Sequence, residues 1–480
     1  MASKKTVTAD NLKGLGVDRL AGILLALADE DAGIKRRLRL ELAAGKGGAV
    51  VGAEVAKRLT ALHGARSFVD WQKRPAFVKD LDLQRSLIVD RVADSDPALA
   101  LDLMWRFLEL AKPVFERVDD STGSVGDVFR TACNDLGTLA SKAEANPAAL
   151  ADRVFTALSS NDYGVYDRLV EVVLPALGST GVDRLKSRLT EALAARADRG
   201  GERDWRATAL RRALQDIADW VGDVNAYIAL IPEPDRHRSQ VAAEMARRLL
   251  AAGRAAEALA ALEAAKPHRR PARGGAIDDL ELLGYRGGDG EWETAYIDTL
   301  DALGHRERAQ ACRWAVFEER LSVERLRAYL KALPDFDDVV AEDKAMAHAR
   351  AFPHVLTALH FFHEWPNPAE AAELILARPT EIDGNAYYLL DPAARWLEGR
   401  YPLAATLLRR AMIEDTLDGA KSSRYKHAAR HMLECLAVAP TIGDFRSFES
   451  HDAFTARLRA AHGRKAGFWS RYAEIAGSKP

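Results

Sequence analysis

The stretch RRLLAAGRAAEALAALEAA, residues 247–265, decides the fold that we expect for the chain. An apolar helix ends at Gly253, because glycine accepts the left-handed backbone conformation that closes a helix. A second apolar helix follows, and Ala258 stands five positions after the glycine. The small alanine side chain lets the second helix approach the first closely, where a larger one would clash. The stretch therefore predicts a hairpin of two packed helices.

The same arrangement recurs around two further glycines. Gly304 is followed five positions later by Ala309, and Gly399 is followed in the same way by Ala404. A weaker copy, residues 360–377, has prolines in place of the glycine. The C-terminal half is therefore predicted to repeat one helix-hairpin unit.

These hairpins, within residues 238–417, resemble those of the tetratricopeptide repeat family. In the weaker copy Ala371 takes the position of the small residue. The glycines lie farther apart than the roughly 34 residues of a standard repeat of that family. Most of the consensus aromatic residues are also missing. The resemblance thus implies tetratricopeptide-like hairpins with insertions.

The N-terminal half has the spacing of amphipathic helices but lacks the glycine–alanine pair. Leu99, Leu103, Phe107 and Leu110 form one of many apolar stripes at intervals of three and four residues. Short turns such as residues 94–97 separate the stripes, and no strand alternation is found. We predict an all-α fold, an α-α superhelix (solenoid) of stacked helix pairs, HEAT-like in the N-terminal half and tetratricopeptide-like in the C-terminal half.

The longest break in the helical pattern is KPHRRPARGGAIDDLELLGYRGGDG, residues 266–290. Its prolines, glycines and mixed charges are typical of an irregular connection. We therefore predict an N-terminal helical repeat region over residues 1–265 and a C-terminal tetratricopeptide-like region over residues 291–480, joined by this connection.

Three segments give the whole chain a resemblance to an uncharacterised bacterial α-helical repeat family. They are DRLAGILLALADED at residues 18–31, SFVDWQKR at residues 67–74 and LSVERLRAYLKALPDFDDV at residues 321–339. The resemblance implies no catalytic residue that could be carried over to this chain.

Composition limits the classes of protein that fit. Lys plus Arg number 68 and Asp plus Glu 70, which gives a formal net charge of -2. A nucleic-acid-binding protein usually has a basic excess, so binding to nucleic acid remains open but is not favoured. The three cysteines are far apart and odd in number, which indicates a reducing, cytoplasmic location. The chain has no apolar run of membrane-spanning length, so we expect no membrane contact.

The best candidate metal ligands are His427 and His431, with Cys435 and Glu434 nearby. Residues four apart lie on one face of a helix, so the two histidines could share a zinc ion. A residue two turns away does not easily reach the same ion. The alternative is that the histidines flank a buried helix face and that Cys435 belongs to the core. We assign no metal site and no cofactor, and keep His427 and His431 as candidates.

No motif of a nucleophile, phosphate loop or dinucleotide site is complete in this sequence. His360 and His363 lack the spacing of a zinc protease. The oxygen-rich segment 119–127 lacks the closing glutamate of a calcium loop and is expected to cap the following helix. We therefore predict a non-enzymatic protein-interaction scaffold that binds a protein or peptide partner. The alternatives are a nucleic-acid-associated repeat protein and a metal-binding protein or enzyme.

Overall fold

The computed structural model describes residues 7–30, 33–35, 38, 48–197, 204–267 and 289–477. These residues are almost entirely helical, and the β-structure among them is one isolated bridge between Val69 and Val118. The chain forms two compact units, Met1–Pro232 (unit 1) and Glu233–Pro480 (unit 2). The predicted all-α class is confirmed. Residues 268–288 of the expected connection lie outside the described residues, so the predicted domain limits stay a prediction.

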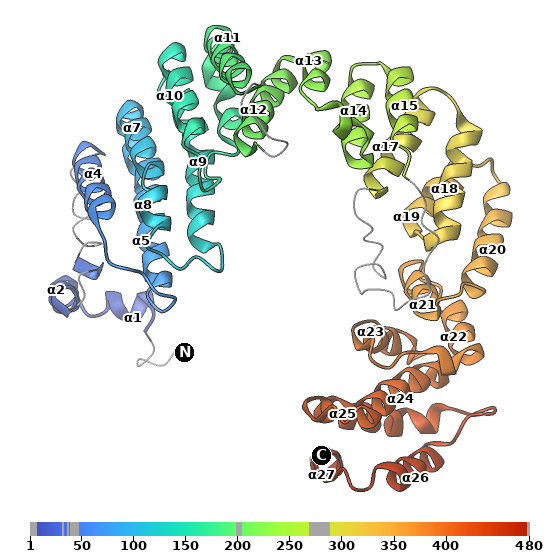
Figure 1. Cartoon of the computed structure of the whole chain (residues 1–480). Coiled ribbons are helices and arrows are strands. Elements are labelled where there is room, and N and C mark those ends of the chain that lie inside the picture. The colour runs from blue at the N-terminus through green and yellow to red at the C-terminus, as the bar shows by residue number, and fades with distance from the viewer. Residues whose placement is uncertain are drawn as a thin grey trace. The chain divides into compact units, whose positions relative to one another are not determined.

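The described helices of unit 1 are α1 (Ala9–Lys13), α2 (Val17–Glu30), α4 (Gly48–Gly64), α5 (Arg74–Leu87), the π-helix η1 (Ile88–Val92), α6 (Ala93–Ser95), α7 (Pro97–Leu108), α8 (Ala111–Phe115), α9 (Ser124–Lys142), α10 (Pro147–Ser159), α11 (Leu169–Ala197), α12 (Trp205–Val221) and α13 (Val224–Ala229). Most of their packing joins helices close together in the chain: α7 contacts α4 and α9, and α11 contacts α9, α10 and α12. Figure 1 shows α4, α7 and α9 following one another in this order.

The core of unit 1 forms where the apolar stripes of these helices meet. Phe129 of α9 is fully buried, and its ring centroid lies 5.4 Å from that of Phe107 and 5.6 Å from that of Phe115. Helix α9 also approaches α11 very closely. A methyl group on Gly137 of α9 would stand 2.2 Å from the carbonyl oxygen of Val172. The glycine is therefore required by the distance between two backbones.

The described helices of unit 2 are the 3-10 helix η2 (Glu233–His237), α14 (Ser239–Ala251), α15 (Ala255–Ala264), α17 (Asp289–Ala302), α18 (Arg306–Arg320), α19 (Val323–Lys331), α20 (Asp337–Arg350), α21 (Val355–Glu364), α22 (Pro368–Ala377), η3 (Pro379–Glu381), α23 (Tyr387–Leu397), α24 (Pro402–Asp418), η4 (Ser422–Arg424), α25 (Tyr425–Val438), η5 (Ala439–Thr441), α26 (His451–His462) and α27 (Ala466–Gly477). From α17 to α25 each helix packs on the next one, and several also contact the helix after that. Unit 2 is thus a stack of helices in chain order, as in an α-α solenoid.

The predicted hairpins are present as α14–α15, α17–α18, α21–α22 and α23–α24. Gly253 and Gly304 have left-handed φ values of 74° and 75°. The amide that follows each glycine donates to a carbonyl of the preceding helix, Arg254 to Leu249 and His305 to Leu300. The alanines expected at the helix contacts are all buried: Ala258, Ala309, Ala371 and Ala404.

Gly399 corrects one part of this prediction. The φ angle of Gly399 is not positive, so this glycine does not close α23 in the left-handed conformation. Tyr401 instead donates its amide hydrogen to the carbonyl of Leu397 at 2.7 Å, and α24 then begins at Pro402. A proline at the first helical position, with its fixed φ, starts the second helix without a left-handed residue.

This difference predicts opposite effects of the same substitution at two glycines. Gly253→Ala is expected to lower the free energy of unfolding by about 1–2 kcal/mol, the cost of a left-handed L-residue. Gly399→Ala is expected to cause no loss and a gain of up to about 1 kcal/mol, since alanine restricts the unfolded chain. Urea denaturation followed by circular dichroism measures both, and equal losses at the two positions would contradict the assignment.

In the part of the chain that the structure describes, none of the helices has both the length and the apolar character needed to cross a bilayer.

Candidate functional site

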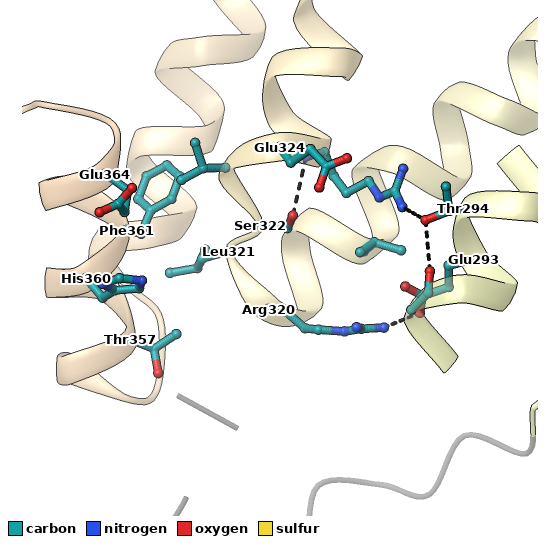
Figure 2. A pocket seen from close by; sticks show the side chains of 14 residues that line it. Glu293, Thr294, Arg320, Leu321, Ser322, Glu324, Thr357, His360, Phe361 and Glu364 are labelled. Carbon is teal, nitrogen blue, oxygen red and sulfur yellow. Dashed lines mark hydrogen bonds and ion pairs between the residues drawn. The ribbon is translucent and has the colours of Figure 1, made fainter. Parts of the chain in front are cut away.

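A cavity of about 350 Å³ lies in unit 2 where α17, the α18–α19 turn and α21 meet (Figure 2). Helix α17 contributes Glu293 and Thr294, and α21 contributes Thr357, His360, Phe361 and Glu364. The wall between them comes from Arg320, Leu321, Ser322, Glu324 and Arg325 at the α18–α19 turn. The cavity is therefore lined by residues of α17, α18, α19 and α21.

The turn between α18 and α19 depends on one left-handed residue. Leu321 has φ 54° and ψ 40° and ends α18, and its own side chain is buried. The hydroxyl of Ser322 then accepts a hydrogen bond from the amide of Arg325 at 3.3 Å and caps α19. An L-residue in this conformation costs roughly 1–2 kcal/mol, which burial of the leucine side chain offsets. The sharp turn places Arg320 and Arg325 on the same wall.

Charged pairs hold this wall together. Arg320 forms an ion pair with Glu293, and both side chains are only 16% exposed. Burial raises the pKa of Glu293, although the neighbouring Arg320 opposes the shift. Arg325 donates a hydrogen bond to the hydroxyl of Thr294. Figure 2 shows both interactions as links from the turn to α17.

Two other carboxylates in the cavity are more accessible. Glu324 is exposed, and the side chain of Glu364 is 54% exposed. Within the described ranges, neither forms an ion pair with lysine or arginine, and the partner of Glu364 is His363 at 3.7 Å. Burial lowers the pKa of His360, which favours its neutral form. The site thus combines a fixed ion pair with two accessible carboxylates, Glu324 on the same wall and Glu364 on α21.

The hydroxyls of Ser322 and Thr294 have structural partners in this arrangement. The hydroxyl of Ser322 lies at the cap of α19, and that of Thr294 both donates to the carbonyl of Gly290 and accepts from Arg325. Nucleophilic catalysis needs a hydroxyl or thiol hydrogen-bonded to a base. Among the described residues, neither of these two hydroxyls is hydrogen-bonded to a side chain that could act as its base.

The histidines predicted as metal ligands have different surroundings. His427 is exposed, whereas His431 is 5% exposed. The structure brings His431 together with Glu434 and with Asp391 of α23, with ligand atoms within 4.8 Å of one another. Cys435 is fully buried, and its Sγ lies 4.0 Å from the carbonyl of Thr406, so it belongs to the core. The sequence analysis missed Asp391, because no local spacing connects α23 with α25.

Arginines already neutralise the two carboxylates of this group. Asp391 accepts a hydrogen bond from Arg395 at 2.6 Å, and Glu434 accepts one from the Nε of Arg409 at 3.0 Å. His431 Nδ1 lies 3.0 Å from the Oε2 of Glu434. A divalent cation here would face these guanidinium charges at close range, which opposes its binding. The group is best described as a partly buried ion-pair network.

Other residues singled out in the sequence have structural contacts. His363 packs edge-on against Trp396, with ring centroids 5.1 Å apart. In segment 119–127, Asp120 accepts hydrogen bonds from the amides of Val125 and Gly126, both at 2.9 Å, and so holds the start of α9 as expected. The segment therefore has the capping role that the sequence predicts.

Two basic clusters of the sequence, residues 236–238 and 247–248, are partly engaged with carboxylates. Arg247 forms an ion pair with Glu291 at 3.2 Å, and Arg238 forms one with Asp235 at 3.6 Å. A further cluster, residues 36–39, lies almost wholly outside the described residues. The ion pairs of Arg247 and Arg238 reduce the net positive charge of these two clusters.

The cysteines give a prediction that tests the described core. Burial raises the pKa of both Cys133 and Cys435 to about 12, while Cys312 is partly exposed. Because the thiolate is the reactive form, we expect one thiol in the native protein and three after denaturation to react with a disulfide reagent at pH 8. Spectrophotometric titration, with peptide mapping of the labelled site, measures this. Rapid native labelling of Cys435 would show that α25 does not pack as described.

Helices stacked in chain order define the described part of the chain as an all-α helical-repeat protein. The chain belongs to the family of unknown function DUF6880, whose sequence model matches residues 2–471. This confirms the predicted membership of a helical-repeat family without an assigned activity.

The other comparisons add little. No curated protein sequence matches the chain. One similar solved structure is described as a "Circular tandem repeat protein with novel repeat topology and enhanced subunit contact surfaces". It is 12% identical, and the match covers 94% of this chain and 91% of that one with a TM-score of 0.13. A score this low supports no argument about the present fold.

Proposed function

We propose that the chain is a non-enzymatic protein-interaction scaffold, in which the cavity between α17, the α18–α19 turn and α21 receives an extended segment of a protein partner. The observation that carries the proposal is that successive helices of one stack share the lining of this cavity. Helical-repeat proteins bind partners across such successive elements. Glu324 and Glu364 favour a partner segment that carries lysine or arginine, by charge complementarity.

The finer repeat assignment is part of this proposal. The left-handed closures at Gly253 and Gly304, each with a buried alanine five positions later, support tetratricopeptide-like hairpins in unit 2. The neighbour-to-neighbour packing of α7, α9 and α11 supports a HEAT-like arrangement in unit 1. We also propose a cytoplasmic location, which the odd number and wide separation of the three cysteines in the sequence support.

The test is affinity capture of the tagged full chain from its native cells, compared with two charge-matched double variants. Glu324→Lys/Glu364→Lys reverses both accessible carboxylates of the cavity. Glu307→Lys/Asp335→Lys makes the same change of charge at exposed positions outside it. We expect the wild type and the second variant to retain one stoichiometric protein partner, which the first variant loses. Circular dichroism and thermal melting verify that both variants are folded.

Two results would overturn the proposal. One is a wild-type preparation without a stoichiometric protein partner, including one that carries nucleic acid instead. The other is equal retention of the partner by both double variants, which would place the binding surface outside this cavity.

A further inference from the structure

A second cavity in unit 2, of about 440 Å³, lies between α23, α24, η4 and α25. Three arginines line it, namely Arg395, Arg424 and Arg430, whereas the lining includes one carboxylate, Asp391. Its volume is in the range of small-molecule pockets. The cavity does not share a lining residue with the one proposed to bind a protein partner.

Each of the three arginines lies near a carboxylate, but not all of their N–H donors are hydrogen-bonded. Asp391 forms ion pairs with Arg395 at 2.6 Å and with Arg430 at 3.8 Å. The Nε of Arg430 is buried without a hydrogen-bond partner, although a carboxylate oxygen of Glu434 lies 3.4 Å away. Each guanidinium carries several N–H donors in a rigid fork and cannot release its charge. An additional acceptor with several oxygens would fit this shortage.

An aromatic ring lies next to this positive wall. The guanidinium of Arg424 lies over the ring of Tyr387, 4.8 Å from the centroid, donates to Asn385 at 2.9 Å and lies 3.9 Å from Asp415. These contacts hold the guanidinium in place while its side chain stays 36% exposed. Tyr387 itself is 53% exposed, so part of its surface is available to a flat group of a ligand.

We propose that this cavity binds a small organic phosphate, with the phosphate held by Arg395, Arg424 and Arg430 and a ring of the ligand against Tyr387. Phosphate oxygens accept paired hydrogen bonds from guanidinium groups, and these are among the stronger hydrogen bonds in proteins. Asp391 keeps two of the arginines oriented, because both contact the same carboxylate. Binding at this site is independent of the proposed protein partner.

The test is calorimetric titration of the full chain with adenosine 5′-monophosphate, adenosine and inorganic phosphate. We expect the monophosphate to bind, inorganic phosphate to compete with it, and adenosine to bind at least about tenfold more weakly, as expected for loss of charged hydrogen bonds. Arg395→Gln/Arg424→Gln should lower the affinity for the monophosphate by about 10- to 100-fold for the same reason. Tyr387→Leu should weaken the binding of the monophosphate but not that of inorganic phosphate.

The matched control is Arg400→Gln/Arg459→Gln, which removes the same charge from two arginines that lie over aromatic rings outside the cavity. We expect its affinity to equal that of the wild type. The proposal is overturned if the wild type binds neither phosphate probe, or if the two double variants lose affinity equally, since that would show non-specific attraction. Thermal melting of each variant confirms that a loss of binding does not come from unfolding.

Discussion

Replacing Arg409 with alanine is expected to lower the free energy of unfolding by about 3 kcal/mol, because it removes a large buried side chain from the core and breaks two ion pairs. Arg409 lies in α24 and its side chain is 1% exposed. Its Nε donates to Glu434 at 3.0 Å, and its terminal nitrogen donates to Glu398. Arg409 of α24 therefore links α25 to Glu398, the residue that follows α23. Its removal also leaves a cavity in the core.

The pH dependence of this effect follows from Glu434. Burial opposes the ionisation of this carboxyl, but the hydrogen bond from His431 and the charges of His431, Arg409 and Arg430 keep its pKa below the usual value. A carboxyl with a lowered pKa stabilises the fold above its unfolded pKa, near 4.5, and loses this contribution as pH falls through its folded pKa. The difference in the free energy of unfolding between the wild type and Arg409→Ala should thus be largest at pH 7 and become smaller below about pH 4.5.

Urea denaturation at both pH values measures the prediction, and two variants serve as controls. Arg400→Ala removes an exposed arginine of the same unit and should change stability by less than about 0.5 kcal/mol. Arg409→Met/Glu434→Gln removes charge from both partners and should recover much of the loss. A loss at Arg409 no larger than that at Arg400 would disprove the role of the network.

Gly137→Ala is expected to cost about 2–3 kcal/mol, as overpacking of a tight interface does. The new methyl group would stand 2.2 Å from the Val172 carbonyl oxygen and 2.8 Å from its carbon. These are backbone atoms of α11 and cannot rotate away, so the two helices must separate. The exchange protection of amides in α9 and α11 should fall together, which hydrogen exchange detects.

Gly126 of the same helix provides the control. A methyl group there meets first a terminal nitrogen of Arg130 at 3.0 Å, the end of a flexible side chain. Gly126→Ala should therefore change stability by no more than about 1 kcal/mol, with the better helix propensity of alanine in its favour. A similar loss at both glycines would show that α9 and α11 are not in backbone contact at Gly137.

The sequence predicted the helix contacts that follow from a short residue spacing. It did not predict the residues whose role comes from contacts between helices distant in the chain. The positions of Ala258, Ala309 and Ala404 follow from a fixed interval after a glycine, and all three are buried. Arg409 and Asp391, by contrast, acquire their importance from partners on other helices. No local pattern marks an arginine in α24 as buried, because its usual place on a helix is the exposed face.

The same limit applies to the two cavities. Their walls combine residues from separate helices, and what joins them is the packing angle of each helix pair, which side-chain shape sets. Gly399 shows that even a local pattern can have two solutions. The sequence signal for the turn was correct, but proline at the start of the next helix replaced the left-handed glycine.

The chain-order packing of unit 2 has a consequence for how the protein is made. A helix that packs on the one just before it can bury its apolar side chains as soon as both have left the ribosome. Because most contacts join residues close in sequence, little loop-closure entropy is lost before they form, and such topologies fold quickly. During synthesis, each newly completed hairpin from α17 to α25 would cover the exposed apolar surface of its predecessor. Nascent chains stopped after α18, α22 or α24 should therefore already resist proteolysis up to their last hairpin.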